Sequence, residues 1–145
     1  MAYLKEMSLK LAKETEHRPT PKKQRFSDET LAEVRESLVI GLLAGSQPHR
    51  FIGIWAVVVE KRVFVRSWSI KPEGWFNSFK KDKRGTVEIE GKRFSIRAVR
   101  TRSERLKKAV DQAYLEKYNT PASLKYVRDL NGPRSRATTT ELVPD

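Results

Sequence analysis

The spacing of apolar residues along the chain changes between a helical period and an extended one. Apolar residues at spacings of three and four predict a short amphipathic helix within residues 1–17 (Leu4, Met7 and Leu11). A helical period also follows Ser27 and Ser103, and serine is among the residues that favour a helix N-cap. We therefore expect helices that run from these two serines to near residues 37 and 119.

Shorter runs rich in branched apolar residues, separated by turn residues, predict β-strands. We expect strands over residues 38–44, 51–59, 62–68, 85–90, 92–101 and 137–143, and short helices over residues 75–79 and 122–129. The run from Ile54 to Val59 shows no alternation of apolar and polar residues, so we expect the strand over 51–59 to be buried on both faces. Such a strand belongs at the centre of a barrel or beneath a subunit interface.

The dipeptide Glu60-Lys61 joins the strands over 51–59 and 62–68. A two-residue loop would pair Val58 with Val63 and Val57 with Phe64, and the same register would place Trp55 opposite Arg66. An arginine among aromatic side chains is either a structural cation stacked on the rings or a clamp for an anion. The residues alone leave both roles open.

A second tight turn, at Glu90-Gly91, predicts another hairpin, in which Val87 lies opposite Phe94 and Glu88 opposite Arg93. This register separates two faces. One face carries Val87, Ile89, Phe94 and Ile96, and the other carries Arg93, Ser95 and Arg97. The first face is predicted to point into the core.

Length and composition favour one domain with a charged surface. The 145 residues, of which 33% are charged, suffice for one hydrophobic core but not for two ordinary domains. Two prolines and clustered charges between residues 17 and 25 indicate an extended linker. We expect an arm of helix and linker over residues 1–25 and a single domain over residues 26–145.

The balance of charge is strongly positive. Lys and Arg total 30 against 18 Asp and Glu, which gives a net charge of +12 and attracts nucleic acid, anionic membrane or a phosphorylated small molecule.

The absence of Cys removes disulfides, thiol catalysis and thiolate zinc sites. The two histidines, His17 and His49, have no carboxylates at ligand spacing, so no metal site and no Ser-His-Asp triad is predicted.

The sequence offers no membrane-spanning segment. No apolar run reaches the roughly 20 residues of a transmembrane helix. The first 17 residues contain acidic side chains and no continuous apolar stretch, which excludes a secretory signal. We therefore expect a cytoplasmic protein with no membrane partner.

One loop has the composition of an anion site. Ser69 and Lys71 lie in it, and Gly74 leads from it into the short helix that begins with Trp75. Hydroxyl groups, a lysine and the free backbone N–H groups of a helix start are suited to holding a phosphate.

Several motifs together resemble one family. They are the strand ending in Arg66-Ser67-Trp68, then Gly74-Trp75-Phe76, then a helix with Ala113-Tyr114-x-x-Lys117-Tyr118, and a last strand ending in Val143-Pro144. This order is similar to that of the bacterial domain of unknown function 2255 family, and the resemblance covers residue 26 to the C-terminus.

That family looks related to the split-barrel flavin-binding superfamily, which includes pyridoxamine-phosphate-oxidase-like proteins and deazaflavin-dependent nitroreductases. The resemblance implies an α+β split β-barrel of mostly antiparallel strands with flanking helices, which forms a homodimer. It also implies an oxidoreductase that uses FMN or a deazaflavin. It places the cofactor and its phosphate at Arg66, Ser67, Trp68, Ser69 and Lys71, with Trp75 packed nearby. It assigns no catalytic residue.

Two alternatives need no cofactor. The first is a nucleic-acid-binding module, motivated by the net charge and by Arg93, Arg97, Arg100 and Arg102 on the second hairpin and just after it. The second is a structural dimer without ligand, whose charge serves solubility. The sequence leaves both open.

Overall fold

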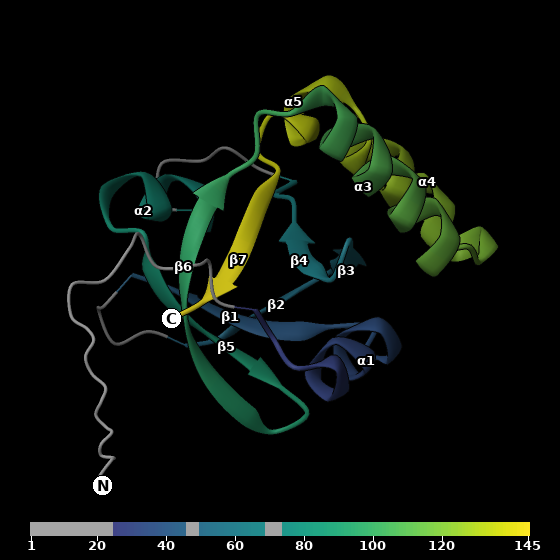
Figure 1. The fold of residues 1–145 in the computed structure, drawn as a ribbon. Coiled ribbons are helices and arrows are strands. Elements are labelled where there is room, and N and C mark those ends of the chain that lie inside the picture. The colour runs from purple at the N-terminus through teal and green to yellow at the C-terminus, as the bar shows by residue number, and fades with distance from the viewer. Residues whose placement is uncertain (1–24, 46–49, 69–73) are drawn as a thin grey trace, which may run out of the picture.

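The structure, a computed structural model, describes residues 25–45, 50–68 and 74–145. These residues form an α+β fold (Figure 1). The strands are β1 (Ile40–Ala44), β2 (Ile52–Ile54), β3 (Ala56–Val59), β4 (Arg62–Val65), β5 (Arg84–Ile89), β6 (Lys92–Arg100) and β7 (Thr140–Pro144). The helices are α1 (Asp28–Glu36), α2 (Trp75–Lys81), α3 (Glu104–Lys117), α4 (Pro121–Leu130) and α5 (Pro133–Arg136). The helix predicted within residues 1–17 lies outside the described residues.

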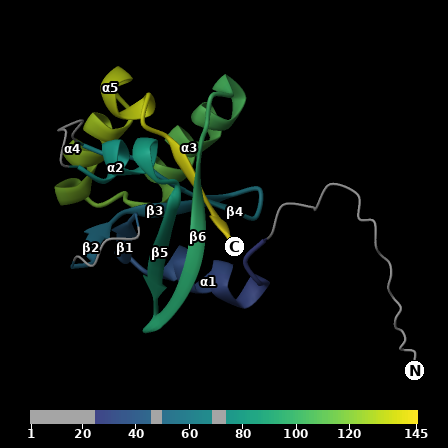
Figure 2. The same ribbon diagram turned by 90° about the vertical axis from the view of Figure 1, so that its left-hand side faces the viewer.

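The strands form one antiparallel sheet in the order β2-β1-β5-β6-β7-β4-β3. Its two outer strands, β2 and β3, follow each other in the chain with only Trp55 between them. The sheet therefore curls until its edges nearly meet, and the expected α+β barrel of antiparallel strands with flanking helices is confirmed. The helices α2 and α5 lie at one end of this barrel and α1 lies at the other (Figures 1 and 2).

The expected continuous strand over residues 51–59 is wrong in two respects. The chain breaks at Trp55 into β2 and β3, and these are the outer strands of the sheet rather than its centre. Ile52 and Gly53 are exposed. The run lacks alternation because Ile54 and Ala56 face the barrel core while Val57 faces a second core under α3.

The predicted hairpin registers are confirmed for both tight turns. Val58 pairs with Val63 and Val57 with Phe64 in the first hairpin. In the second, Val87 pairs with Phe94 and Glu88 with Arg93, and the arginine face is exposed as expected. The first ladder ends at Ala56 and Val65, however, so the predicted pair of Trp55 and Arg66 is not part of it.

The predicted helix starts are also confirmed. The Ser27 hydroxyl accepts a hydrogen bond from the Thr30 N–H, and the Ser103 hydroxyl accepts one from the Leu106 N–H. The helix expected over residues 122–129 is α4, which is slightly longer. The strand expected from residue 137 begins only at Thr140, because the preceding residues form α5 and the turn after it.

Two hydrophobic cores stabilise the fold. One fills the barrel and includes Leu42, Val87, Ile96 and Leu142. The other lies between the β3–β4 hairpin and the pair α3 and α4, around the buried Tyr114.

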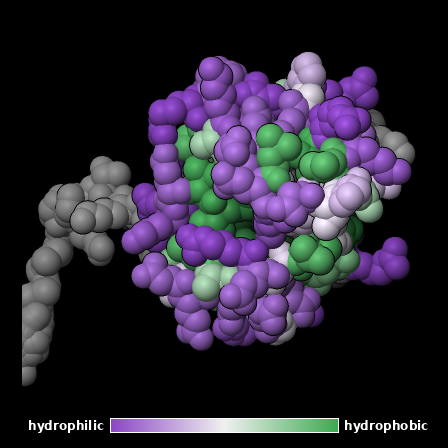
Figure 3. Space-filling model, turned by 90° about the vertical axis from the view of Figure 1, so that its right-hand side faces the viewer, coloured by the Kyte–Doolittle hydropathy of each residue, from purple (hydrophilic) through white to green (hydrophobic). Residues whose placement is uncertain are grey.

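On the face that carries α1, α3 and α4, polar side chains cover most of the surface, and apolar residues emerge in separate patches (Figure 3). Within the described ranges, no helix is long and apolar enough to cross a membrane.

Candidate functional site

The strand β4 delivers Arg66 into the interior, where the side chain is only 1% exposed. Its Nε donates to the Thr139 hydroxyl at 2.8 Å, and its Nη1 lies 2.7 Å from the Asp111 carboxylate. Further acceptors are the Asn131 side chain and the carbonyls of Leu130 and Lys107. Arg66 therefore ties β4 to α3, to the end of α4 and to the start of β7.

The charge of Arg66 is balanced within this network. Burial lowers the pKa of the Arg66 guanidinium, and the hydrogen bond that it donates to Asp111 opposes that shift. Arg136 donates to the same Asp111 carboxylate and to Glu104, and these two bonds raise the pKa of Arg136. Of the two roles open for Arg66, this geometry favours the structural cation, because the donors are directed to acceptors of the chain itself.

Of the other predicted cofactor residues, the ones that the structure describes do not line a common cavity. Ser67 is buried, and its backbone N–H donates to the Thr138 hydroxyl at 2.8 Å. Trp68 is 41% exposed and borders a groove beside α5, whereas Trp75 borders a different cavity with Ile52. The structure thus does not bring these side chains around one cavity. Ser69 and Lys71 lie outside the described residues, and the binding role of the whole set stays a prediction.

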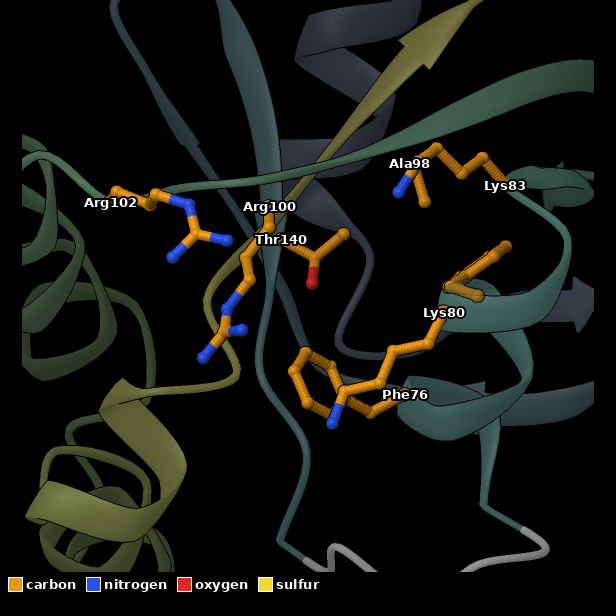
Figure 4. A pocket seen from close by; sticks show the side chains of 8 residues that line it. Phe76, Lys80, Lys83, Ala98, Arg100, Arg102 and Thr140 are labelled. Carbon is orange, nitrogen blue, oxygen red and sulfur yellow. The ribbon is translucent and has the colours of Figure 1, made fainter.

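A different cavity, which we call the basic pocket, has the composition of an anion site. It lies between α2, the end of β6 and the start of β7, and has a volume of about 210 Å³ (Figure 4). It is lined by Phe76, Phe79, Lys80, Lys83, Ala98, Arg100, Arg102 and Thr140. Four of these eight side chains are cationic and none is acidic.

Local structure explains why these residues converge. Ile96, Ala98 and Arg100 alternate with outward-facing residues along β6, so Arg100 lies on the side of the strand that faces the core. At this end the barrel core stops, and the arginine enters the pocket instead of the apolar interior (Figure 4). Helix α2 supplies Phe76 and, four residues later, Lys80 on the same face.

Two of the cations share one aromatic ring. The Lys80 ammonium lies 5.1 Å and the Arg100 guanidinium carbon 5.4 Å from the centre of the Phe76 ring. Arg100 also donates to the Ala137 carbonyl at 3.1 Å, and the Thr140 hydroxyl donates to the Thr138 carbonyl. In the part of the chain that the structure describes, none of the four pocket cations takes part in a salt bridge.

The basic pocket therefore concentrates positive charge that no residue in the described ranges neutralises with a salt bridge. Such a cavity attracts an anion, and a phosphate group matches the mixture of lysine and arginine donors. The sequence pattern indicates Arg100 and Arg102 only as nucleic-acid contacts and does not predict the pocket. One signal was available, because Arg100 continues the apolar positions Ile96 and Ala98.

Lys117, which belongs to the Ala-Tyr-x-x-Lys-Tyr motif, connects elements of the fold. Its ammonium donates to the carbonyls of Val34 at 2.8 Å and Ala56 at 2.6 Å, which joins α3 to α1 and β3. Burial lowers the pKa of Lys117 to about 8. Tyr114 and Tyr118 of the same motif donate to the carbonyls of Trp55 and Leu38. The motif thus fastens α3 to the barrel.

Comparison with known proteins gives a family and a fold. Residues 30–142 match the profile of DUF2255, described as an uncharacterised protein conserved in bacteria. The crystal structure of the conserved hypothetical protein Rv2991 from Mycobacterium tuberculosis is similar, with a TM-score of 0.56 and 16% sequence identity over 89% of this chain and 84% of that one. No curated protein gives a significant sequence match. The similar structure supports the fold alone.

Proposed function

Because the chain belongs to the domain of unknown function 2255 family, whose description assigns no activity, we propose a function from the pocket itself. The protein binds a phosphorylated planar cofactor, FMN or a deazaflavin, and uses it as an oxidoreductase. The observation that carries this proposal is the basic pocket, in which four cations without a salt bridge to a described residue surround an aromatic floor. The phosphate is assigned to these cations.

The donors of the pocket fit a phosphate group. Lys80, Lys83 and Arg102 are exposed and charged, and Arg100 has donors left beyond the one that binds the Ala137 carbonyl. Thr140 is suited only to accept, because its proton is directed to the Thr138 carbonyl. Bound flavin or deazaflavin would supply hydride transfer, which requires no Cys or His from the protein. The chain would contribute phosphate binding and an apolar wall at Phe76 and Phe79.

The size of the pocket bears on the oligomeric state. Its volume of about 210 Å³ is below the roughly 300–1,000 Å³ of small-molecule sites. A cofactor would extend beyond it, and we propose that a second copy of the chain covers the remainder. Ile52, which is 44% exposed on the outer strand β2, borders a cavity with Trp75 on α2 and is the residue through which we expect the copies to meet.

The test of the cofactor is a titration with FMN, riboflavin and a deazaflavin, followed by fluorescence. We expect FMN or the deazaflavin to bind, riboflavin to bind more weakly because it lacks the phosphate, and Arg100→Ala or Lys80→Ala to weaken FMN binding about tenfold. The matched control is Arg97→Ala, which removes an exposed arginine from the outer face of β6. Absence of binding by both phosphorylated cofactors would refute the proposal.

The test of the dimer is sedimentation with and without cofactor. We expect a dimer that Ile52→Glu converts to a monomer, with loss of cofactor affinity. Leu124→Glu on α4, an equally apolar and similarly exposed position, is the control and should leave the dimer intact. A monomeric wild-type protein with full cofactor affinity would contradict the dimer and leave the basic pocket as a complete site.

A further inference from the structure

A second concave surface is lined by Trp68 and by residues of α5. This surface, which we call the tryptophan groove, has a volume of about 370 Å³. It is lined by Trp68, by Arg128 and Asp129 of α4, and by the turn from Gly132 to Ser135, which includes Arg134. It shares no lining residue with the basic pocket.

The groove borders a cluster of aromatic rings that reach the surface. Trp68 is 41% and Tyr126 44% exposed, and their ring centres lie 6.1 Å apart in a T-shaped arrangement. Both contact Trp55, at 5.3 Å and 6.2 Å. Trp55 in turn stacks on the buried Tyr118 at 4.0 Å, with the ring planes nearly parallel. The exposed rings are thus held in place by a ring of the core.

Cations surround these rings. Arg128 and Arg134 are exposed, and neither takes part in a salt bridge with another described residue. Lys125 lies with its ammonium 5.1 Å from the centre of the Tyr126 ring. Asp129 is the one acidic residue of the lining. The surroundings therefore combine two partly exposed aromatic rings with a surplus of positive charge.

We infer that the tryptophan groove binds single-stranded nucleic acid. Stacking of a base on an exposed aromatic ring, together with arginines along the phosphate backbone, is the common physical basis of single-strand binding. Trp68 and Tyr126 supply the rings, and Arg128 and Arg134 the phosphate contacts. The net charge of +12 draws a polyanion toward this surface at long range.

The charges argue against a second copy of the chain as the occupant. An interface with two-fold symmetry places the same patch of both copies face to face. Here it would bring Arg128 and Arg134 of the two copies together in a poorly hydrated space, which is electrostatically unfavourable. Stacking also selects against duplexes, because their bases are already stacked on each other. The inference does not depend on the cofactor proposed for the basic pocket.

The experiment measures the anisotropy of a labelled oligo(dT) of about 12 nucleotides at low salt, near 50 mM. We expect Trp68→Ala to weaken binding about tenfold or more, as loss of one stacking partner does, while Trp68→Phe retains most of the affinity. Arg134→Ala should reduce the slope of log K against log salt by about 0.7. The control is Arg97→Ala, which removes the same charge outside the groove. This variant should bind the oligonucleotide about tenfold more tightly than Trp68→Ala.

Three results would overturn the inference. The first is equal weakening by Trp68→Ala and Arg97→Ala, which would reduce the binding to general electrostatics. The second is duplex binding as tight as that of the single strand. The third is no binding at low salt. If, in addition, the molecular mass in solution rises with protein concentration and Trp68→Ala abolishes that rise, the groove is assigned to a second copy of the chain. Trp68→Phe keeps the test valid if the alanine variant folds poorly.

Discussion

Two arginines at the same end of the barrel have opposite surroundings. Arg66, at the end of β4, is 1% exposed and donates to five acceptors of the chain. Arg100, at the end of β6, is exposed and donates to the carbonyl of Ala137. The strand β7 lies between them and pairs with both strands. The number of acceptors already engaged, rather than the residue type, separates the structural cation from the candidate ligand-binding one.

The first way to test this comparison is to remove Arg66, and it has the largest expected effect. Arg66→Ala leaves buried acceptors, among them the Leu130 and Lys107 carbonyls, without their donor, although Arg136 still binds Asp111. Because each buried acceptor left unpaired costs about 1–3 kcal/mol, we expect a loss of about 3–5 kcal/mol of unfolding free energy. Arg100→Ala should cost no more than about 0.5 kcal/mol. Denaturant unfolding measures both. Similar costs for the two variants would mean that the two arginines do not differ as the structure indicates.

The next effect is stabilisation by inorganic phosphate. An anion that binds only the folded chain raises the unfolding free energy by about 2.7 kcal/mol when its concentration is 100 times the Kd. Thermal unfolding should therefore shift upward with phosphate in the wild-type chain and in Arg97→Ala, and much less in Lys80→Ala or Arg100→Ala. An equal shift in all four proteins would show that phosphate acts on the surface in general.

A smaller effect is expected from Tyr114, a residue of α3 whose side chain reaches the backbone just before β3. Tyr114→Phe removes the hydroxyl that donates to the Trp55 carbonyl at 2.8 Å. The unpaired carbonyl should cost about 1–3 kcal/mol of unfolding free energy, without altering the response to phosphate. A lost phosphate response in this variant would mean that the second core and the basic pocket are coupled.

A further effect is the pH dependence of stability due to Lys117. Its pKa is lowered to about 8 in the folded chain, whereas an unfolded lysine titrates near 10.4. The unfolded chain then binds more protons between these values, so stability should rise with pH from about 8 to about 10. Above that range the tyrosines of the unfolded chain ionise at a lower pH than the folded Tyr114 and Tyr118, because burial raises the pKa of these two residues. The rise in stability should therefore end there. Urea unfolding should show this rise in the wild type and a flat profile in Lys117→Met.

Local features of the fold could be predicted because their causes lie close together in the sequence. The caps at Ser27 and Ser103 and both hairpin registers depend on residues a few positions apart. The split at Trp55 could not be predicted. The same apolar run is expected for one strand with two buried faces and for two outer strands that face different cores.

The candidate site was harder to predict for the same reason. The partners that make Arg66 structural, Asp111, Asn131 and Thr139, follow it by 45, 65 and 73 residues. No local pattern connects them with the Arg66-Ser67-Trp68 stretch. The basic pocket likewise joins α2 to the end of β6 across a hairpin, and only the position of Arg100 in line with Ile96 and Ala98 hinted at it.

The central claim is that Arg100, and not Arg66, meets the phosphate. The most direct measurement follows the Nε–Hε signals of the arginine side chains by NMR while phosphate or FMN is added. The account predicts that the Arg100 signal moves and saturates, and that the Arg66 signal, fixed by its bond to Thr139, stays in place. Movement of the Arg66 signal with a silent Arg100 would contradict it.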